Sequence, residues 1–112
     1  MKRVEPWQAW WVDFSPQVGT EQAGRRLAVV VASAFHCRFP IPLTIVLPMT
    51  TRERALPHRV PVTLPGKETS WVITEQPHTI DHGRIVGDHP IVTLTDDEIA
   101  AVRYALAKMI DI

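Results

Sequence analysis

The chain has 112 residues, 46% hydrophobic and 21% charged, an ordinary balance for one globular domain over residues 1–112 that argues against a disordered chain. Twelve lysines and arginines balance twelve aspartates and glutamates, which excludes a uniformly basic nucleic-acid coat; any nucleic-acid contact must come from charges gathered on one face. The single cysteine, Cys37, excludes an internal disulfide and a multi-cysteine zinc site.

The first half of the chain is predicted to form strands that proline and glycine separate. Residues 10–14 are aromatic and β-branched, as in a strand, and a Ser-Pro pair ends the run. After a polar loop, residues 27–32 form an apolar run of buried-strand length. We expect residues 35–42 to be irregular and residues 43–47 to form a second buried strand that continues towards residue 51.

Two shorter strands are predicted further on. Residues 59–64 alternate between polar and apolar, and Pro61 among them indicates a position at the edge of a sheet. Residues 71–74 are rich in strand-forming side chains and run directly into Glu75-Gln76-Pro77.

The last predicted element is a helix. Thr95 and Glu98 have the spacing of a capping box, and the two aspartates between them suit the positive end of a helix dipole. Apolar residues then recur at helical spacing, at Ile99, Val102, Leu106 and Met109. The expected architecture is mainly β with a C-terminal helix: a small, strongly bent, mostly antiparallel sheet that suits a small barrel.

No apolar run approaches the ~20 residues of a membrane helix, and no stretch near the N-terminus resembles a signal peptide. We therefore expect a soluble, cytoplasmic protein that does not contact a membrane.

Two adjacent arginines end the polar loop before residue 27. At the start of a strand, Arg25 and Arg26 must point to opposite faces, so one of them can enter a groove. The guanidinium fork matches two phosphate oxygens. A hairpin loop with a solvated charge pair explains the same residues, and both interpretations stay open here.

Polar residues also follow two other predicted strands. Thr50 and Thr51 offer hydroxyls that can donate to a phosphate oxygen, or they are simply strand-forming residues. Glu75, Gln76 and His78 offer a carboxylate, an amide and an imidazole that could read base edges or move protons, although a turn set by Pro77 is the simpler explanation.

Other kinds of site have little support. His78 and His82 are four residues apart, but a proline and a glycine bracket them and no third ligand has metal-site spacing, so we expect no metal and no cofactor. The cluster of Trp7, Trp10 and Trp11 could stack on unpaired bases, but core packing is the better explanation for at least two of them.

Three motifs together resemble the MazF/PemK/Kid family of toxin ribonucleases. They are WVDFSP followed by GTEQAGRR and AVVVAS (residues 11–33), VLPMTT (residues 46–51) and EQPHTID (residues 75–81). Their order and spacing cover nearly the whole chain. The resemblance implies an SH3-like barrel of the Kid/CcdB type that forms a homodimer. It also implies metal-independent cleavage of single-stranded RNA (mRNA) at short sequences, giving a 2′,3′-cyclic phosphate and a 5′-hydroxyl, and an antitoxin protein whose tail occupies the RNA groove.

The resemblance also assigns residues. The family's essential arginine falls on Arg26 and its essential threonine on Thr50. The candidates for the acid or base are Glu21, Glu75 and His78. The candidates for contact with RNA are Thr20, Gln22, Thr51 and Gln76.

The sequence departs from the family pattern at four places. The usual Arg-Gly-Asp/Glu start before the first tryptophan is absent, and Pro6-Trp7-Gln8-Ala9 stands there instead. Leu27 replaces a proline, His78 an arginine, and Ile73 the arginine that Kid-like members carry two residues before the acid of the third motif. Two alternatives therefore stay open: a catalytically weak barrel that only binds RNA or antitoxin, and a gyrase-poisoning toxin of the CcdB type.

Overall fold

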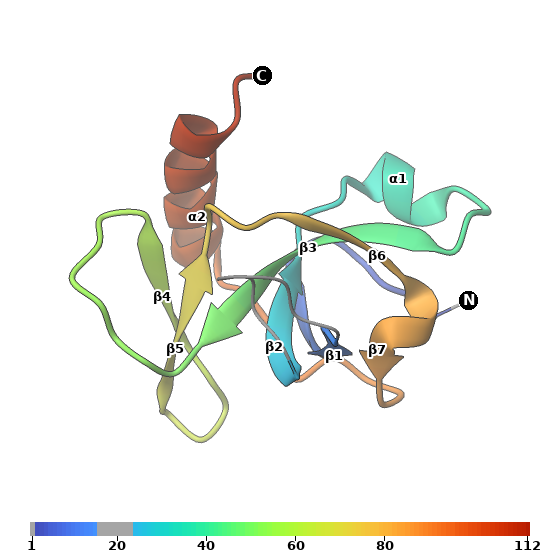
Figure 1. Cartoon of the computed structure of the whole chain (residues 1–112), viewed down its shortest axis with the longest axis horizontal. Helices are drawn as coiled ribbons and strands as arrows, with labels where there is room; N and C mark the ends of the chain where they lie inside the picture. Colours follow the sequence, from blue (N-terminus) through green and yellow to red (C-terminus); the bar gives the residue numbers. More distant parts are fainter. Residues whose placement is uncertain (1, 16–23) are drawn as a thin grey trace.

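The structure is a computed structural model that describes residues 2–15 and 24–112 (Figure 1). Its elements are, in chain order, β1 (Gln8–Asp13), β2 (Arg25–Val30), α1 (Ala34–Arg38), β3 (Leu43–Thr50), β4 (Arg59–Thr63), β5 (Thr69–Ile73), β6 (His78–Asp81), the 3-10 helix η1 (His82–Arg84), β7 (Ile85–Val86), β8 (Val92–Thr93) and α2 (Asp96–Met109). The mainly β fold with a C-terminal helix is confirmed.

The strands form one bent antiparallel sheet. Its order is β4-β5-β3-β2-β1-β7, with β6 also paired to β3 and β8 to β1. The long strand β3 pairs with β6 through its first half and with β5 through its last two residues, so the sheet changes direction along β3. The result is barrel-like, although among the described residues the sheet is not closed. The edge position expected for Pro61 is confirmed, because β4 ends the sheet.

Each face of the sheet carries its own core. The face that α2 covers buries aliphatic side chains, chiefly Val29, Leu47, Met49, Val60, Val62, Val72, Val102 and Ala105. The opposite face buries a second cluster, chiefly Trp10, Val12, Phe14, Ala28, Val30, Val46 and Ile80. Because side chains alternate along a strand, successive residues of one strand join different faces of the sheet. Figure 1 shows α2 standing beside β4 and β5.

The start of α2 is held by the predicted capping box. The Thr95 hydroxyl accepts a hydrogen bond from the Glu98 backbone N–H at 3.2 Å, and a Glu98 carboxylate oxygen accepts one from the Thr95 N–H at 2.9 Å. The second Glu98 oxygen accepts a hydrogen bond from the backbone N–H of Thr63 at 2.9 Å. Glu98 therefore joins the helix to the end of β4. No helix in the described ranges is long and apolar enough to cross a membrane.

Two parts of the chain differ from the prediction. Residues 35–42 were expected to be irregular, but they include most of α1, whose first turn is capped by the Ser33 hydroxyl accepting from the His36 N–H at 3.1 Å. Residues after Pro77 form β6 rather than only a turn, because they pair with Leu43–Val46 along β3. Both elements are too short to show a hydrophobic period.

Candidate functional site

The antiparallel register places Arg26 and Thr50 on the same face. In the β2–β3 ladder Ala28 pairs with Pro48 and Val30 with Val46, and because side chains alternate along a strand, Arg26 and Thr50, each two residues beyond the last pair, project from the same face. This is the face opposite α2. Arg25, by contrast, is exposed and pairs with Asp13 across the β1–β2 ladder.

The local structure orients the Thr50 hydroxyl. Its oxygen accepts a hydrogen bond from the backbone N–H of Arg52 at 3.2 Å, just where the chain leaves β3. Because a hydroxyl both donates and accepts, its hydrogen is left to donate to another oxygen. Thr51 is exposed next to it. A guanidinium and a hydroxyl on one face form a donor pair that suits a phosphate group.

Glu75 lies in a compact charged cluster, which we call the Glu75 cluster, made of Glu75, Arg59 and His58. Arg59 donates from Nε and Nη2 to the two carboxylate oxygens, each at 3.2 Å, and His58 Nε2 lies 2.9 Å from Oε2. The His58 backbone oxygen also accepts from the Thr74 hydroxyl at 2.6 Å, which fixes the start of β4 against β5. All three members of the cluster are partly buried, with side chains 10–28% exposed.

The environment keeps Glu75 ionised. Burial alone raises the pKa of its carboxyl, but the hydrogen bonds and charge of Arg59 together with the hydrogen bond to His58 outweigh burial, so the pKa lies below its usual value. A carboxylate held in this way is a weak proton acceptor and a strong hydrogen-bond acceptor.

Sequence reasoning missed Arg59 and His58. Arg59 pairs with Ile73 across the β4–β5 ladder, so it supplies a guanidinium beside the position where the family resemblance expects an arginine. The only available signal was an adjacent histidine and arginine where the alternating residues of β4 begin. Their partner is 16 and 17 residues away in sequence, and only the strand register reveals it.

His78 lies on the same face, and Gln76 lies in the turn between β5 and β6. His78 opens β6 opposite Val46, four residues along β3 from Thr50, and its ring packs edge-on against Phe14 with the ring centroids 5.2 Å apart. The Gln76 side-chain oxygen is buried and has no hydrogen-bond partner among the described residues. Both side chains stay candidates for contact with a ligand.

Three candidates, Thr20, Glu21 and Gln22, lie outside the described residues. The two residues that flank this stretch are fixed: the Phe14 N–H donates to the Gly24 carbonyl at 2.9 Å, and Arg84 donates to the carbonyl oxygens of Asp13, at 3.2 Å, and of Ser15. Gly24 has a φ of +72°, a conformation that favours glycine.

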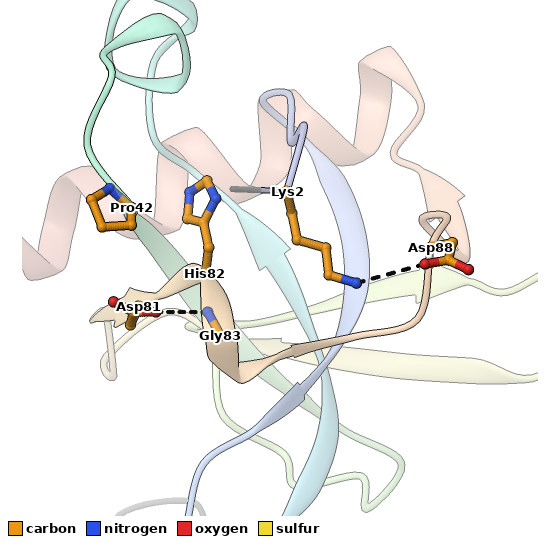
Figure 2. Close-up of a pocket in the computed structure, with 6 residues that line it drawn as sticks. All are labelled: Lys2, Pro42, Asp81, His82, Gly83 and Asp88. Atoms are coloured by element: carbon orange, nitrogen blue, oxygen red, sulfur yellow. Dashed lines mark hydrogen bonds and ion pairs between the residues drawn. The ribbon is translucent and has the colours of Figure 1, made fainter.

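A separate hollow lies at the other end of β3. It is a cavity of about 490 Å³ beside η1 (Figure 2), lined by Lys2, Pro42, Asp81, His82, Gly83 and Asp88. His82 is buried there, and burial is the main cause that lowers its pKa. Because Asp81 pairs with Leu43, seven residues before Thr50, this hollow is distinct from the Arg26–Thr50 face.

In the described ranges the histidines form no group that could hold a metal ion, and the cysteine is not a reactive thiol. His78 and His82 lie on β6 and η1 respectively, and no three His, Cys, Asp or Glu side chains in those ranges group to hold a metal ion. The Cys37 thiol donates to the Ala32 carbonyl, 3.7 Å from the sulfur, and burial raises its pKa. A thiol in this state is not activated as a nucleophile.

Replacing Glu75 by glutamine is expected to lower the free energy of unfolding at pH 7 by about 1–2 kcal/mol, because Arg59 then loses a charged partner. Since the folded-state pKa of Glu75 is lowered, its contribution is fully present above the unfolded value of about 4.3 and is lost as the pH falls through the folded value. Urea unfolding from pH 7 to pH 3 measures both effects.

The wild type should lose more stability than Glu75→Gln as the pH falls below about 5. Glu53→Gln, a change at an exposed acid in the loop after β3, is the matched control and should behave as wild type. Parallel pH curves for wild type and Glu75→Gln would contradict the assignment.

These features define a class of protein: a small barrel-like antiparallel sheet with a C-terminal helix, whose face opposite the helix presents a phosphate-sized donor pair. The chain belongs to the family described as the PemK-like, MazF-like toxin of type II toxin–antitoxin systems, whose family model matches residues 5–110.

Individual relatives agree with this family. The chain is 40% identical over 62 residues to the endoribonuclease toxin MazF of Escherichia coli K12. The matched segment is 55% of this chain and 53% of that relative, so the chain spans about half the length of the relative. The crystal structure of MazF (Form-I) from Deinococcus radiodurans matches with a TM-score of 0.82 at 24% identity, over 97% of both chains. The MazE–MazF complex (Form-II) from the same organism matches with a TM-score of 0.76 at 19% identity, over 100% and 99% of the two chains. At these identities the two structures support the fold alone.

Proposed function

We propose that this chain is a toxin endoribonuclease that cleaves single-stranded RNA at short sequences and is neutralised by an antitoxin protein. The observation that carries the proposal is that Arg26 on β2 and Thr50 at the end of β3 lie on the same face of the sheet, the face opposite α2. Family membership supports it, as do the names of the relatives: one is an endoribonuclease toxin, and another is a toxin in complex with MazE.

The proposed reaction is an in-line attack of a ribose 2′-hydroxyl on the adjacent phosphorus. The 2′-oxygen–phosphorus bond forms as the bond to the 5′-oxygen breaks, giving a 2′,3′-cyclic phosphate and a 5′-hydroxyl. Negative charge grows on the non-bridging oxygens, and fixed hydrogen-bond donors stabilise that charge. Arg26 clamps the phosphate and donates a hydrogen bond towards the leaving 5′-oxygen, which takes up its proton from water, while Thr50 donates a hydrogen bond to a phosphate oxygen.

A separate group must accept the 2′-hydroxyl proton, because an arginine stays protonated. Glu21, Glu75 and His78 are the candidates. The ion pair with Arg59 weakens Glu75 as a base, which supports a role for Glu75 in holding Arg59 and contacting RNA, and leaves Glu21 and His78 as proton acceptors. Thr20, Gln22, Thr51 and Gln76 are proposed to contact the RNA strand.

The proposal includes a homodimer. Phe35 of α1 and Phe39, the residue that follows the helix, are 66% and 44% exposed, and their ring centroids are 4.5 Å apart. Ile41 and Leu43 are also exposed on the segment that follows α1. An apolar group of this kind on the surface is typical of a protein contact, and we assign it to the second copy.

The decisive experiment incubates the purified protein with unstructured and structured RNA, with EDTA or with added magnesium. We expect cleavage of the unstructured RNA to be unchanged by EDTA, because the proposed transition-state donors are side chains, and we expect the 5′ fragments to end in a 2′,3′-cyclic phosphate.

Each alternative predicts a different result. Binding without cleavage indicates a barrel that only binds RNA, and inhibition of gyrase without any action on RNA indicates a CcdB-type toxin. A requirement for a divalent ion would contradict the proposed chemistry.

A further inference from the structure

Trp71 is the aromatic side chain placed next to the donor pair. In the β3–β5 ladder Thr50 pairs directly with Trp71, so the indole projects from the same face as the Thr50 hydroxyl. On the next strand Trp71 pairs with Pro61, which is exposed. The indole therefore lies between an exposed proline and the proposed phosphate site, on the face that α2 leaves uncovered.

Core packing does not account for Trp71. Its side chain is only partly buried, whereas Ser70 and Val72 on either side are buried at 2% and 0% exposure. Neither hydrophobic cluster includes it. In the parts of the chain that the structure describes, its indole makes no hydrogen bond and no ring contact with an aromatic or cationic side chain.

The other tryptophans have different surroundings. Trp10 is 3% exposed within a core cluster, and the Trp7 ring packs beneath the Arg103 guanidinium at 5.3 Å. Trp11 is 43% exposed, but it lies on the opposite face of the sheet from Arg26, because its neighbour Val12 pairs with Arg26. Of the four, Trp71 alone combines partial exposure with a place beside Thr50.

We propose that Trp71 is a stacking platform for the base that flanks the cleaved phosphate, and so a residue that binds and positions the RNA strand at this site; the proposal rests on the proposed RNA cleavage. Cβ atoms of opposed residues are about 5 Å apart, less than the length of one nucleotide, so a phosphate held by Thr50 brings an adjacent base within reach of the indole. An unpaired base stacks on an aromatic ring, and this contact persists for any base because each base has a π-face.

The test combines a protein change with a nucleotide change. The cleavage position is first mapped with the wild type, and binding is then measured with the same RNA made uncleavable by a 2′-deoxynucleotide at that position. The base on the 5′ or 3′ side of the phosphate is either present or replaced by an abasic nucleotide. For the wild type we expect the abasic change at one of these two sides to weaken binding about tenfold to hundredfold.

Trp71→Ala should show the same weakening with intact RNA and no further loss with the abasic RNA, because both changes remove one contact. Trp71→Phe should keep most of the affinity, and Trp11→Ala, a matched loss of an exposed indole on the other face, should behave as wild type. Trp71→Leu keeps apolar bulk without the ring, so it should also bind the intact RNA more weakly and show no further loss with the abasic RNA. This variant takes the place of Trp71→Ala in the test if Trp71→Ala unfolds.

Two results overturn the proposal for different reasons. If the wild type cleaves RNA but the abasic penalty is the same in wild type, Trp71→Ala and Trp71→Leu, Trp71 is not the platform and the proposed function stands. If the folded wild type neither binds nor cleaves any RNA, the proposed function fails and the role of Trp71 fails with it.

Discussion

Replacing Arg26 by alanine is expected to lower kcat/KM for RNA cleavage by about 10²–10³-fold, the usual cost of removing one charge-stabilising donor. The reason is the place of Arg26 on the face opposite α2, the face that also carries Thr50. Arg26→Lys should recover only part of the loss, because an ammonium cannot bind two phosphate oxygens with the geometry of a guanidinium. Single-turnover kinetics on one mapped site measure these values.

Arg25→Ala is the matched control, because it removes the same charge from the adjacent residue. Arg25 is exposed and points to the other face, so its loss should change the rate by less than about fivefold, an amount typical of an exposed charge at a distance. Thermal unfolding of both variants shows whether the fold is kept. Equal losses for Arg25→Ala and Arg26→Ala would contradict the assignment.

Much of the fold could be predicted because its signals are local. The capping box at Thr95, the helical stripe of α2 and the apolar runs of β2 and β3 each lie within one element, and all are confirmed. The one-turn helix α1 and the two-residue strands β7 and β8 could not be predicted, because they are shorter than any hydrophobic period. Their formation depends on pairing and packing with distant parts of the chain.

The candidate site was predictable residue by residue but not as an arrangement. Arg26 and Thr50 were each identified from sequence, yet their juxtaposition depends on the β2–β3 register, which sequence alone does not state. The partners of Glu75 lie on the preceding strand of a hairpin, so local motifs did not reveal the Glu75 cluster. The tryptophan cluster near the start of the chain was a candidate for base stacking because its members are close in sequence, whereas the strand register places Trp71 beside Thr50.

The alternation of the strands explains how one small sheet carries both a core and a site. Met49 points into the core beneath α2, and Thr50, the next residue, points to the other face. The same change occurs between Val72 and Trp71 on β5 and between Val60 and Arg59 on β4. The site is therefore built on strands whose other side is fully packed, which fixes its geometry without a buried polar network.

Thr50→Val is expected to lower kcat by about 10²-fold, because valine keeps the shape of threonine and removes only the hydroxyl. The loss should appear in kcat and kcat/KM alike if the Thr50 hydrogen bond forms only as charge develops on the phosphate. In the wild type the Arg52 N–H donates a hydrogen bond to the Thr50 hydroxyl. In Thr50→Val this N–H can bind water instead at the exposed turn, so the stability of the fold should change little. Thr50→Ser keeps the donor and should retain most activity.

Thr51→Val tests whether the position matters, since Thr51 is an exposed threonine one residue away and its loss should cost less than about tenfold. A loss as large as that of Thr50→Val would move the assignment to Thr51, and a Thr50→Ser variant as poor as Thr50→Val would show that the methyl group matters rather than the hydroxyl.

In the double variant Arg26→Ala/Thr50→Val, the combined loss should be smaller than the product of the single losses, because both donors stabilise the same phosphate and act as one unit. Fully multiplicative losses would indicate that the two side chains act at separate places, contrary to the proposal that they bind one phosphate on the face that both share.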